Sequence, residues 1–339
     1  MLNIATIGQL ADILQVTVGC LEAVARDAES FYEELVLIDP AKPGKFREVV
    51  NVTGTLRAIQ ASLLCNLLKP NLRPSPYSHG GVVGRTIKTN AEPHRDSVFY
   101  FSTDIADFYP TISQRRVYRL FSGEFGCSRP VSRVCTKLCT RRGHLAQGLI
   151  ASPILADRLM AGPDRRIGAM CDKLGRESGS AVPYTRFVDD LTITAKFPIE
   201  SGSTPRIVVE ILKEYGFRIN PAKQGFGRLA EGGRITKLRI HRGKLDISPE
   251  YLAGVYQQVA DAAALGSGVK EGGVYYTAAQ IFGRIQFIGW VNHGRLGPLM
   301  AKYNSIDWFK VEAEAAAQGL VARRRFLMKK ASCDSSLVV

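Results

Sequence analysis

The chain has 339 residues, of which 45% are hydrophobic, so it can bury a sizeable core and fill two or three domain-sized units, which excludes wholesale disorder. Lysine and arginine outnumber aspartate and glutamate by 45 to 31, and the resulting charge of +14 favours a polyanionic partner, either a nucleic acid or an anionic membrane surface. No apolar run reaches the ~18 residues of a spanning helix, and the first residues lack the pattern of a signal peptide, so we expect a cytoplasmic protein.

Two short amphipathic helices are predicted within residues 5–32, because apolar residues recur there at helical spacing. A helix pair can form a DNA-reading helix-turn-helix. Acidic residues such as Asp12 and Glu22 accompany this pair, however, so packing against the body of the protein is the better interpretation. We expect residues 1–34 to form an N-terminal helical segment.

Two strands are expected next, at residues 35–38 and 46–50, joined by a turn that contains proline and glycine. Lys45 and Arg47 lie two residues apart, so they would share one face of a strand. The leucine-rich pattern of residues 55–69 then predicts a core helix.

A long polar stretch, residues 70–97, separates that helix from the next strand and is rich in glycine and proline. A loop of this length is usually functional or disordered. An apolar run from residue 98 then delivers Asp104 to the end of a strand, and Asp107 and Tyr109 follow as the chain leaves it.

Several cysteines lie in the region that follows. Helices are expected there at residues 113–121 and 129–142. Cys127, Cys135, Cys139 and His144 are close enough to raise the question of a zinc site. Their spacing matches no familiar zinc pattern, and Cys135 and Cys139, four residues apart, fit the buried face of a helix equally well.

A capped helix is predicted after Gln147-Gly148 and is expected to run from Ser152-Pro153 to about residue 170. Pro153 suits the first helical turn, where its missing N–H costs nothing, and Ser152 is a credible N-cap. The alternative interpretation is a capped helix without a functional role.

Two adjacent carboxylates, Asp189 and Asp190, lie between two short runs of β-branched and aromatic residues. Such runs predict strands and Asp-Asp favours a turn, so the simplest interpretation is a β-hairpin with both acids at its tip. A lone Asp-Asp is usually a solvated turn. Asp104 supplies a third carboxylate in a similar context, and three such acids are what a two-metal phosphoryl-transfer site needs, because Mg²⁺ prefers hard oxygen ligands.

The rest of the chain is predicted to be mostly helical. A short helix at residues 207–215 precedes Lys223, and residues 234–240 with 243–245 have the pattern of a hairpin. Further helical patterns cover residues 251–265, 277–291 and 296–303. We expect a loose tail at the C-terminal end.

Three of these segments resemble motifs A, B and C of reverse transcriptases, in that order. They are residues 98–110, 145–153 and 184–194. Residues 79–85 and the Asn-Ala-Glu-Pro-His run at 90–94 resemble the stretch before motif A in bacterial retron enzymes. Two segments depart from the retron pattern: Phe187-Val188 replaces Tyr-Ala, and Ile-Thr-Lys at 235–237 replaces Val-Thr-Gly.

The resemblance covers about residues 35–300 and implies an α+β fold, a right-hand polymerase. The fingers and the palm, an antiparallel sheet with helices, would be interleaved in residues 35–247. A helical thumb would occupy residues 248–325 and track the minor groove of a template–primer duplex. Residues 326–339 would be a flexible basic tail.

The resemblance also implies catalytic and metal-binding residues. The catalytic group would be Asp104, Asp189, Asp190 and Lys223. Two Mg²⁺ ions, or Mn²⁺ in their place, would bind the three aspartates and the backbone carbonyl of Ile105. Lys223 would protonate the departing pyrophosphate; a solvent-exposed lysine without a role is the alternative.

Contacts to substrates follow from the same resemblance. Those to the incoming dNTP and the new base pair would come from Lys45, Arg47, Asp107, Tyr109, Gln147 and Gly148. Arg47 matches the triphosphate-binding arginine of the family, and its fork suits phosphate oxygens. Tyr109 lies where the family carries an aromatic gate against the ribose 2′-hydroxyl, with packing beneath the palm as the alternative. Contacts to nucleic acid would come from Arg85, Asn90, His94, Ser152 and Arg284.

The implied reaction is RNA-templated addition of dNTPs to a primer hydroxyl, which yields a cDNA. A structured non-coding RNA would serve as the template and is a candidate for the primer. The resemblance further implies a role in defence against phage, together with an effector protein from the same locus. No membrane partner is expected. The alternatives are another defence-associated reverse transcriptase with an atypical template, and a non-catalytic RNA-binding protein on a polymerase scaffold. The three intact aspartates argue against the last.

Overall fold

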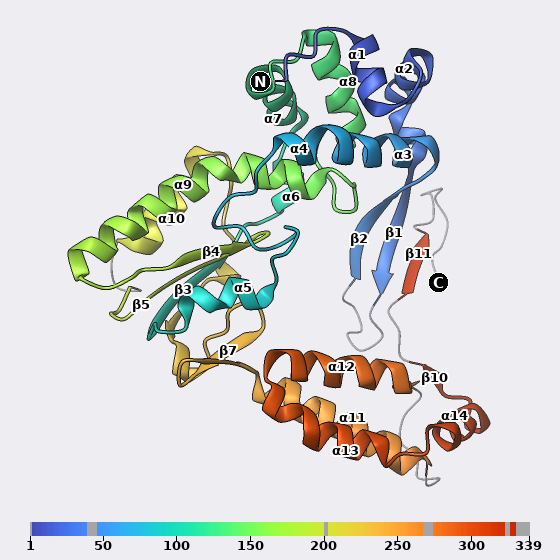
Figure 1. The fold of residues 1–339 in the computed structure, drawn as a ribbon, viewed down its shortest axis with the longest axis vertical. Coiled ribbons are helices and arrows are strands. Elements are labelled where there is room, and N and C mark those ends of the chain that lie inside the picture. Colours follow the sequence, from blue (N-terminus) through green and yellow to red (C-terminus); the bar gives the residue numbers. More distant parts are fainter. Residues whose placement is uncertain (1, 39–45, 200–202, 267–273, 323–325, 330–339) are drawn as a thin grey trace, which may run out of the picture.

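A four-stranded antiparallel sheet carries the acidic residues that the sequence singled out (Figure 1). The computed structural model describes residues 2–38, 46–199, 203–266, 274–322 and 326–329. The strands lie in the order β4 (Tyr184–Phe187), β5 (Asp190–Ala195), β3 (Phe99–Asp104) and β6 (Gly225–Arg228). Beyond Asp190, β5 is buried along its whole length, as its unbroken run of apolar and threonine residues predicts for a central strand.

Helices cover both faces of this sheet. On one side lie α9 (Ser152–Ser178) and α10 (Thr204–Glu214), and on the other lies α5 (Ile87–Ala91). Two consecutive residues of β4 mark the two faces, since Arg186 donates to α9 while the Thr185 hydroxyl donates to the carbonyl of Asn90 on α5. The palm is therefore a three-layer unit at this point.

The helix α9 corrects two expectations. It continues well past residue 170 to Gly179, whose φ of 66° ends it, because buried residues such as Ile167 and Cys171 still face the core. Ser152 is not the N-cap, since Ala151 takes that position and the Ser152 hydroxyl donates to the carbonyl of Ala146.

The fingers are a second antiparallel sheet, in the order β11-β1-β2, with a layer of helices above it (Figure 1). Its strands are β1 (Tyr32–Ile38), β2 (Phe46–Val52) and β11 (Phe326–Lys329). The helices are α1 (Ile7–Leu14), α2 (Val18–Arg26), α3 (Gly54–Ser62), α4 (Lys69–Asn71), α6 (Phe108–Thr111), α7 (Gln114–Arg119) and α8 (Arg129–Cys139), and π-helical turns extend α3 and α7. The predicted N-terminal helix pair and core helix are confirmed, and their apolar faces join one core with the palm.

The strand β11 corrects the expectation of a loose tail. Residues 326–329 pair antiparallel with β1, with Ile38 opposite Phe326 and Leu35 opposite Lys329. Strand addition to an open edge is driven by backbone hydrogen bonds, so it leaves little signal in the sequence. The remainder of the predicted tail, residues 330–339, lies outside the described residues.

The thumb is a separate helical lobe with its own core. It contains α11 (Pro249–Gly266), α12 (Ala278–Val291), α13 (Leu296–Asn304) and α14 (Trp308–Ala317), with the short parallel pair β9 (Val274–Tyr275) and β10 (Val321–Ala322). The hairpin of β7 (Leu238–His241) and β8 (Lys244–Ile247) shares this core. The hairpin thus belongs with the thumb in packing. Its first strand begins four residues later than expected, because Thr236 and Lys237 have positive φ.

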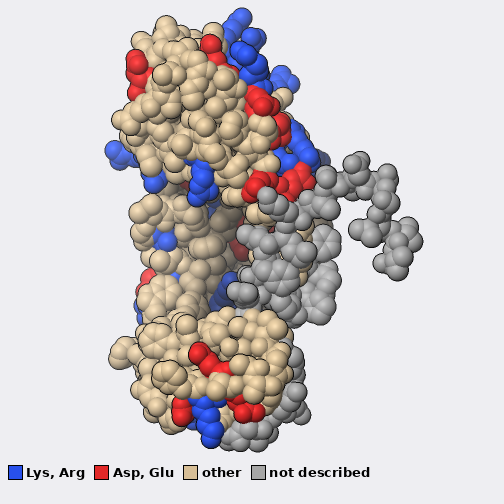
Figure 2. Space-filling view, turned by 90° about the vertical axis from the view of Figure 1, so that its right-hand side faces the viewer, with Lys and Arg blue, Asp and Glu red and all other residues tan. Residues whose placement is uncertain are grey.

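Figure 2 shows that the molecule is hollowed between the thumb and the part of the molecule drawn above it. Some Lys or Arg side chains are visible in this recess. Among the described residues, no single helix is long and apolar enough to cross a membrane; only the pair α1 and α2, bent by 97°, passes the test of length and composition together.

Candidate active site

Three carboxylates meet where the central strands of the palm end. Asp104 is the last residue of β3, Asp190 is the first of β5, and the two face each other in the antiparallel register. Asp189 lies in the two-residue turn between β4 and β5. One carboxylate oxygen from each acid lies within 4.8 Å of the others, and we call these three residues the acid cluster. The predicted hairpin and the convergence of the three acids are confirmed.

The three carboxylates of the acid cluster repel one another. Partial burial and the charges of Asp189 and Asp104 raise the pKa of Asp190 to about 6. Lys223 donates a hydrogen bond to Asp104, with 2.8 Å between Nζ and Oδ2, and this bond raises the pKa of Lys223. The oxygens of the three carboxylates are the hard ligands that Mg²⁺ prefers, and they converge closely enough to share an ion, so the residues present fit a divalent cation.

The turn that carries Asp189 is backed by a loop from the polar stretch. Ser78 pairs with Arg186 as an added parallel bridge, and the His79 N–H donates to the Arg186 carbonyl at 2.7 Å. Gly80 lies against the turn so closely that a Cβ there would be 2.6 Å from Cγ2 of Val188. The polar stretch is therefore folded against motif C, and its glycine is required by this contact.

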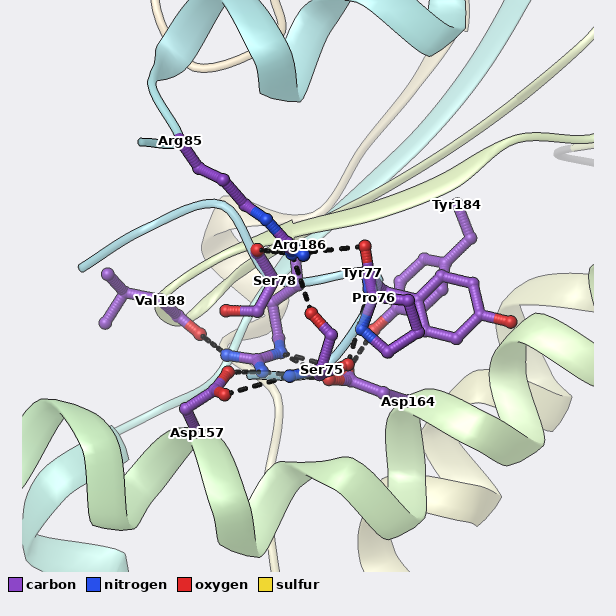
Figure 3. Close-up of polar contacts among 10 residues, drawn as sticks. All are labelled: Ser75, Pro76, Tyr77, Ser78, Arg85, Asp157, Asp164, Tyr184, Arg186 and Val188. Atoms are coloured by element: carbon purple, nitrogen blue, oxygen red, sulfur yellow. Dashed lines mark hydrogen bonds and ion pairs between the residues drawn. The ribbon is translucent and has the colours of Figure 1, made fainter. Parts of the chain in front are cut away.

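A buried charge network underlies the same turn, and sequence reasoning missed it (Figure 3). Arg186 on β4 forms ion pairs with Asp157 and Asp164 of α9, at 2.7 and 2.8 Å, and all three side chains are almost fully buried. We call these residues the Arg186 network. The only signal in the sequence was an arginine inside an apolar strand and two aspartates seven residues apart, on one face of a helix.

Two predicted substrate contacts follow β3 directly. Asp107 is exposed and has a left-handed φ of 47°. Tyr109 is half-buried, and burial together with the charge of Asp189 raises the pKa of its hydroxyl. Phe108 is buried against Phe217, as expected of a core residue, and the Tyr109 ring contacts Phe108 at the edge of the same core.

Gln147 and Gly148 lie between the palm and the fingers. The Gln147 carbonyl accepts a hydrogen bond from the N–H of Val50 on β2, at 3.0 Å. Gln147 itself is exposed. Gly148 has a φ of 110°, and a Cβ on it would lie 1.9 Å from the Val50 carbonyl oxygen. The close backbone approach expected at Gly148 is therefore present, and its partner is the fingers strand.

Three of the predicted nucleic-acid contacts are corrected, because their side chains are buried. Asn90 donates to Thr236, and Ser152 donates to the Ala146 carbonyl as described above. The two ring nitrogens of His94 lie 2.7 and 2.8 Å from the hydroxyls of Thr194 and Thr185, and burial lowers the pKa of His94 to about 3. His94 thus joins the retron-like stretch to β4 and β5, Asn90 joins it to the segment before β7, and Ser152 bonds within its own segment, so these buried side chains serve the fold.

The remaining predicted residues have varied surroundings. Arg85 donates to the carbonyls of Ser75, Pro76 and Ser78, so it fixes the loop behind the turn. Arg284 on α12 donates to Gln258 and lies over the ring of Tyr276.

Three further expectations concern the backbone or undescribed side chains. Arg47 pairs with Leu37 through its backbone, but its side chain and the whole of Lys45 lie outside the described part of the chain. The N–H of Ile105 donates to the carbonyl of Asp189 at 3.0 Å, which ties the end of β3 to the turn.

The cysteines in question belong to the core. Cys127, Cys135 and Cys139 are buried among apolar residues, whereas His144 is exposed. Within the described ranges, the acid cluster is the only group of three such ligands close enough to hold a metal.

Comparison with known proteins places this geometry in a family. Residues 39–248 match the family described as reverse transcriptase (RNA-dependent DNA polymerase). The chain belongs to the reverse transcriptase family. The expected α+β right-hand polymerase is thereby confirmed, and the enzyme is an RNA-directed DNA polymerase.

This reverse transcriptase is similar to curated retron enzymes, which confirms the resemblance seen in its motifs. It is 28% identical over 236 residues to the retron Ec86 reverse transcriptase of Escherichia coli, covering 70% of this chain and 71% of that enzyme. It is 27% and 29% identical to the retron Mx65 and Mx162 reverse transcriptases of Myxococcus xanthus, of which the alignments cover 57% and 47%. The matches to these two enzymes thus span about half of their length.

A telomerase structure from Candida albicans with a fragment of telomeric RNA aligns with 88% of this chain and 61% of its own, at 11% identity and a TM-score of 0.43. This likeness is too weak to carry an argument.

Proposed function

We propose that this reverse transcriptase is a retron-type enzyme that copies a dedicated structured RNA into DNA in the cytoplasm and acts in defence against phage. The observation that carries the catalytic part is the acid cluster, with its three ligand oxygens within 4.8 Å of one another. The similar retron enzymes support the choice of template class. An effector protein encoded beside the enzyme is part of the same proposal.

Asp104, Asp189 and Asp190 would hold two Mg²⁺ ions, and the Ile105 carbonyl would complete their ligands. When bound, such ions supply activation of the primer 3′-hydroxyl and stabilisation of the leaving pyrophosphate. The chain itself holds the aspartates in register by the pairing of β3 with β5. Lys223 keeps a proton beside the acid cluster and would give it to the departing pyrophosphate.

Tyr109 is proposed as the gate that selects the sugar of the nucleotide. Burial, and after it the charge of Asp189, raises the pKa of its hydroxyl, which supports a place near the acid cluster. Tyr109→Ala should raise incorporation of rNTPs relative to dNTPs by roughly tenfold, a steric discrimination of the size that pockets provide. Single-nucleotide extension with each sugar measures this ratio. Phe108→Ala is the matched control, and equal losses with both sugars would assign the gate elsewhere.

An RNA partner is supported by basic side chains without acidic partners. Arg129, Arg133 and Lys137 recur every four residues on α8 and are all exposed, and no described acidic side chain lies within ion-pair distance of them. Changing all three to glutamine should weaken RNA binding and reduce the slope of log K against log salt by about 2–3. The control is Lys173→Gln with Arg206→Gln, since both of these cations already pair with glutamates.

The decisive experiment purifies the protein with its native flanking locus, sequences the RNA bound to it, and supplies Mg²⁺ with labelled dNTPs. The expected result is a cDNA complementary to the bound RNA, and none with Asp189→Ala. Bound RNA without any synthesis by the unaltered enzyme would favour the non-catalytic alternative. Synthesis on unrelated RNA with equal efficiency would remove the dedicated template.

A further inference from the structure

Arg186 is the largest fully buried side chain in the described structure, and each of its guanidinium nitrogens is used. Nε donates to Asp164, and Nη2 donates to Asp164 and Asp157 at 2.8 and 2.7 Å. The third nitrogen, Nη1, does not bond to a carboxylate. It donates to the backbone carbonyl of Val188 at 2.8 Å, as Figure 3 shows. One guanidinium therefore joins α9 to the turn of motif C.

Val188 is the residue that needs such a contact. Its φ is 62°, in the left-handed region, which is costly for a β-branched side chain. A strained conformation of this kind persists only where the surroundings fix it. Gly80 lies against one side of Val188, and the Arg186 guanidinium holds its carbonyl. The next residue along the chain is Asp189, so the conformation of Val188 sets the direction of that carboxylate.

The network is itself held from several directions. Tyr184 donates its hydroxyl to Asp164 at 2.8 Å, and the Ser75 N–H donates to Asp157 at 3.1 Å. The guanidinium thus has no free rotation, because both carboxylates that orient it are fixed by other groups. Its bond to the turn is consequently made in one geometry only.

We propose that Arg186 is a positioning residue for polymerisation: oriented by Asp157 and Asp164, it holds the Val188 carbonyl and thereby directs Asp189 into the acid cluster. The proposal deepens the active site proposed above and rests on it. Loss of the contact should misplace one metal ligand while leaving the RNA and dNTP contacts in place. Loss of the contact should therefore lower kcat and weaken metal binding.

The first test is Arg186→Lys, which keeps the charge but cannot reach both carboxylates and the Val188 carbonyl together, because an ammonium is a compact point charge. We expect kcat for primer extension to fall about 100-fold, the size of effect that a displacement near 1 Å produces. The KM for dNTP and the affinity for RNA should stay within about threefold. Arg166→Lys, an exposed position on α9, is the matched control and should change none of these.

The second test separates positioning from stability. Glycine adopts positive φ without a steric cost, so a turn with Val188→Gly no longer needs its carbonyl to be held. Added to Arg186→Lys, it should restore at least about tenfold of the lost kcat. A folded double variant that regains no kcat would overturn the proposal. An Arg186→Lys enzyme whose kcat, KM and thermal midpoint are all lowered in parallel would also overturn it.

The third measurement needs no catalysis. Mn²⁺ binding to the RNA-free enzyme, followed by the electron paramagnetic resonance signal of free Mn²⁺, should weaken about tenfold in Arg186→Lys, as for other residues that orient metal ligands. If that variant does not fold, Asp157→Asn serves instead, because it keeps the pair of Arg186 with Asp164. Unchanged Mn²⁺ affinity in a folded variant would overturn the proposal. A wild-type enzyme that binds Mn²⁺ but never extends a primer would instead refute the proposed function.

Discussion

Two groups of carboxylates lie side by side in the palm, and the chain neutralises them differently. In the Arg186 network, two acids share a guanidinium whose side chain is 1% exposed and which stays charged at any physiological pH. In the acid cluster, the described part of the chain contributes the ion pair of Lys223 with Asp104, and the Lys223 side chain is 58% exposed. The network contains a buried, permanent cation, whereas the described cation of the cluster is a largely exposed lysine.

This difference relates the way each group of carboxylates is neutralised to the role of that group. Where geometry must be constant, a buried cation with fixed donors is built into the sequence. Where cations and substrates must enter and leave, three carboxylates lie close together, and their repulsion contributes to the raised pKa of Asp190. Each prediction below alters one side of this comparison.

The largest effect is expected from the acid cluster. Asp189→Ala and Asp190→Ala should each lower DNA synthesis by roughly 10³-fold or more, since each removes a metal ligand at the reacting centre. The thermal midpoint should not fall, because repulsion is relieved. Primer extension and thermal unfolding measure the two effects, with the exposed Asp172→Ala as control. Near-normal extension by the double variant would refute the assignment.

Next in size is the stability of the Arg186 network. Asp164→Ala should lower the free energy of unfolding by about 3–5 kcal/mol, because it leaves a buried cation with half its partners. Glu214→Ala, which breaks the exposed pair with Arg166, should cost no more than about 1 kcal/mol. Urea unfolding of the two variants tests the contrast, and equal losses would abolish it.

A smaller effect is expected from Lys223. Lys223→Met should lower kcat about tenfold through loss of a proton donor. It should also lower the Mg²⁺ concentration needed for half-maximal activity, because the lysine occupies Asp104 in competition with a metal. A Mg²⁺ titration of initial rates separates the two, with Lys213→Met on α10 as control. A higher Mg²⁺ requirement would contradict this role.

The smallest effect concerns pH in the metal-free enzyme. The pKa of Asp190 is about 6 in the folded chain and near 3.8 for an ordinary aspartate, so the folded state binds this proton more tightly. Protonation of Asp190 should therefore stabilise the folded enzyme as pH falls from 7 to 5, by roughly 1–3 °C in thermal midpoint, whereas buried His94, whose pKa is lowered to about 3, contributes a loss over the same range. The contribution of Asp190 is the difference between the unaltered enzyme and Asp190→Asn, and saturating Mg²⁺ should reverse that difference. Identical pH profiles for the unaltered enzyme and for Asp190→Asn would contradict the repulsion inferred here.

The sequence by itself determined the acid cluster, because its signals are local. Strand ends, a turn-forming Asp-Asp pair and the order of three motifs all lie within short segments, and antiparallel pairing brings such ends together. Helix faces at the N-terminus and in the thumb were predictable for the same reason, since periodicity of apolar residues is a property of one segment.

Only the tertiary structure decided what distant segments do to one another. His94 and Asn90 look like polar contacts in a loop, yet they are buried because that loop folds onto the sheet. Gly148 is required by a strand nearly a hundred residues earlier, and Arg186 acquires its partners only when α9 packs on β4. Burial, close backbone approach and charge pairing are properties of packed surfaces, and no spacing within one segment encodes them.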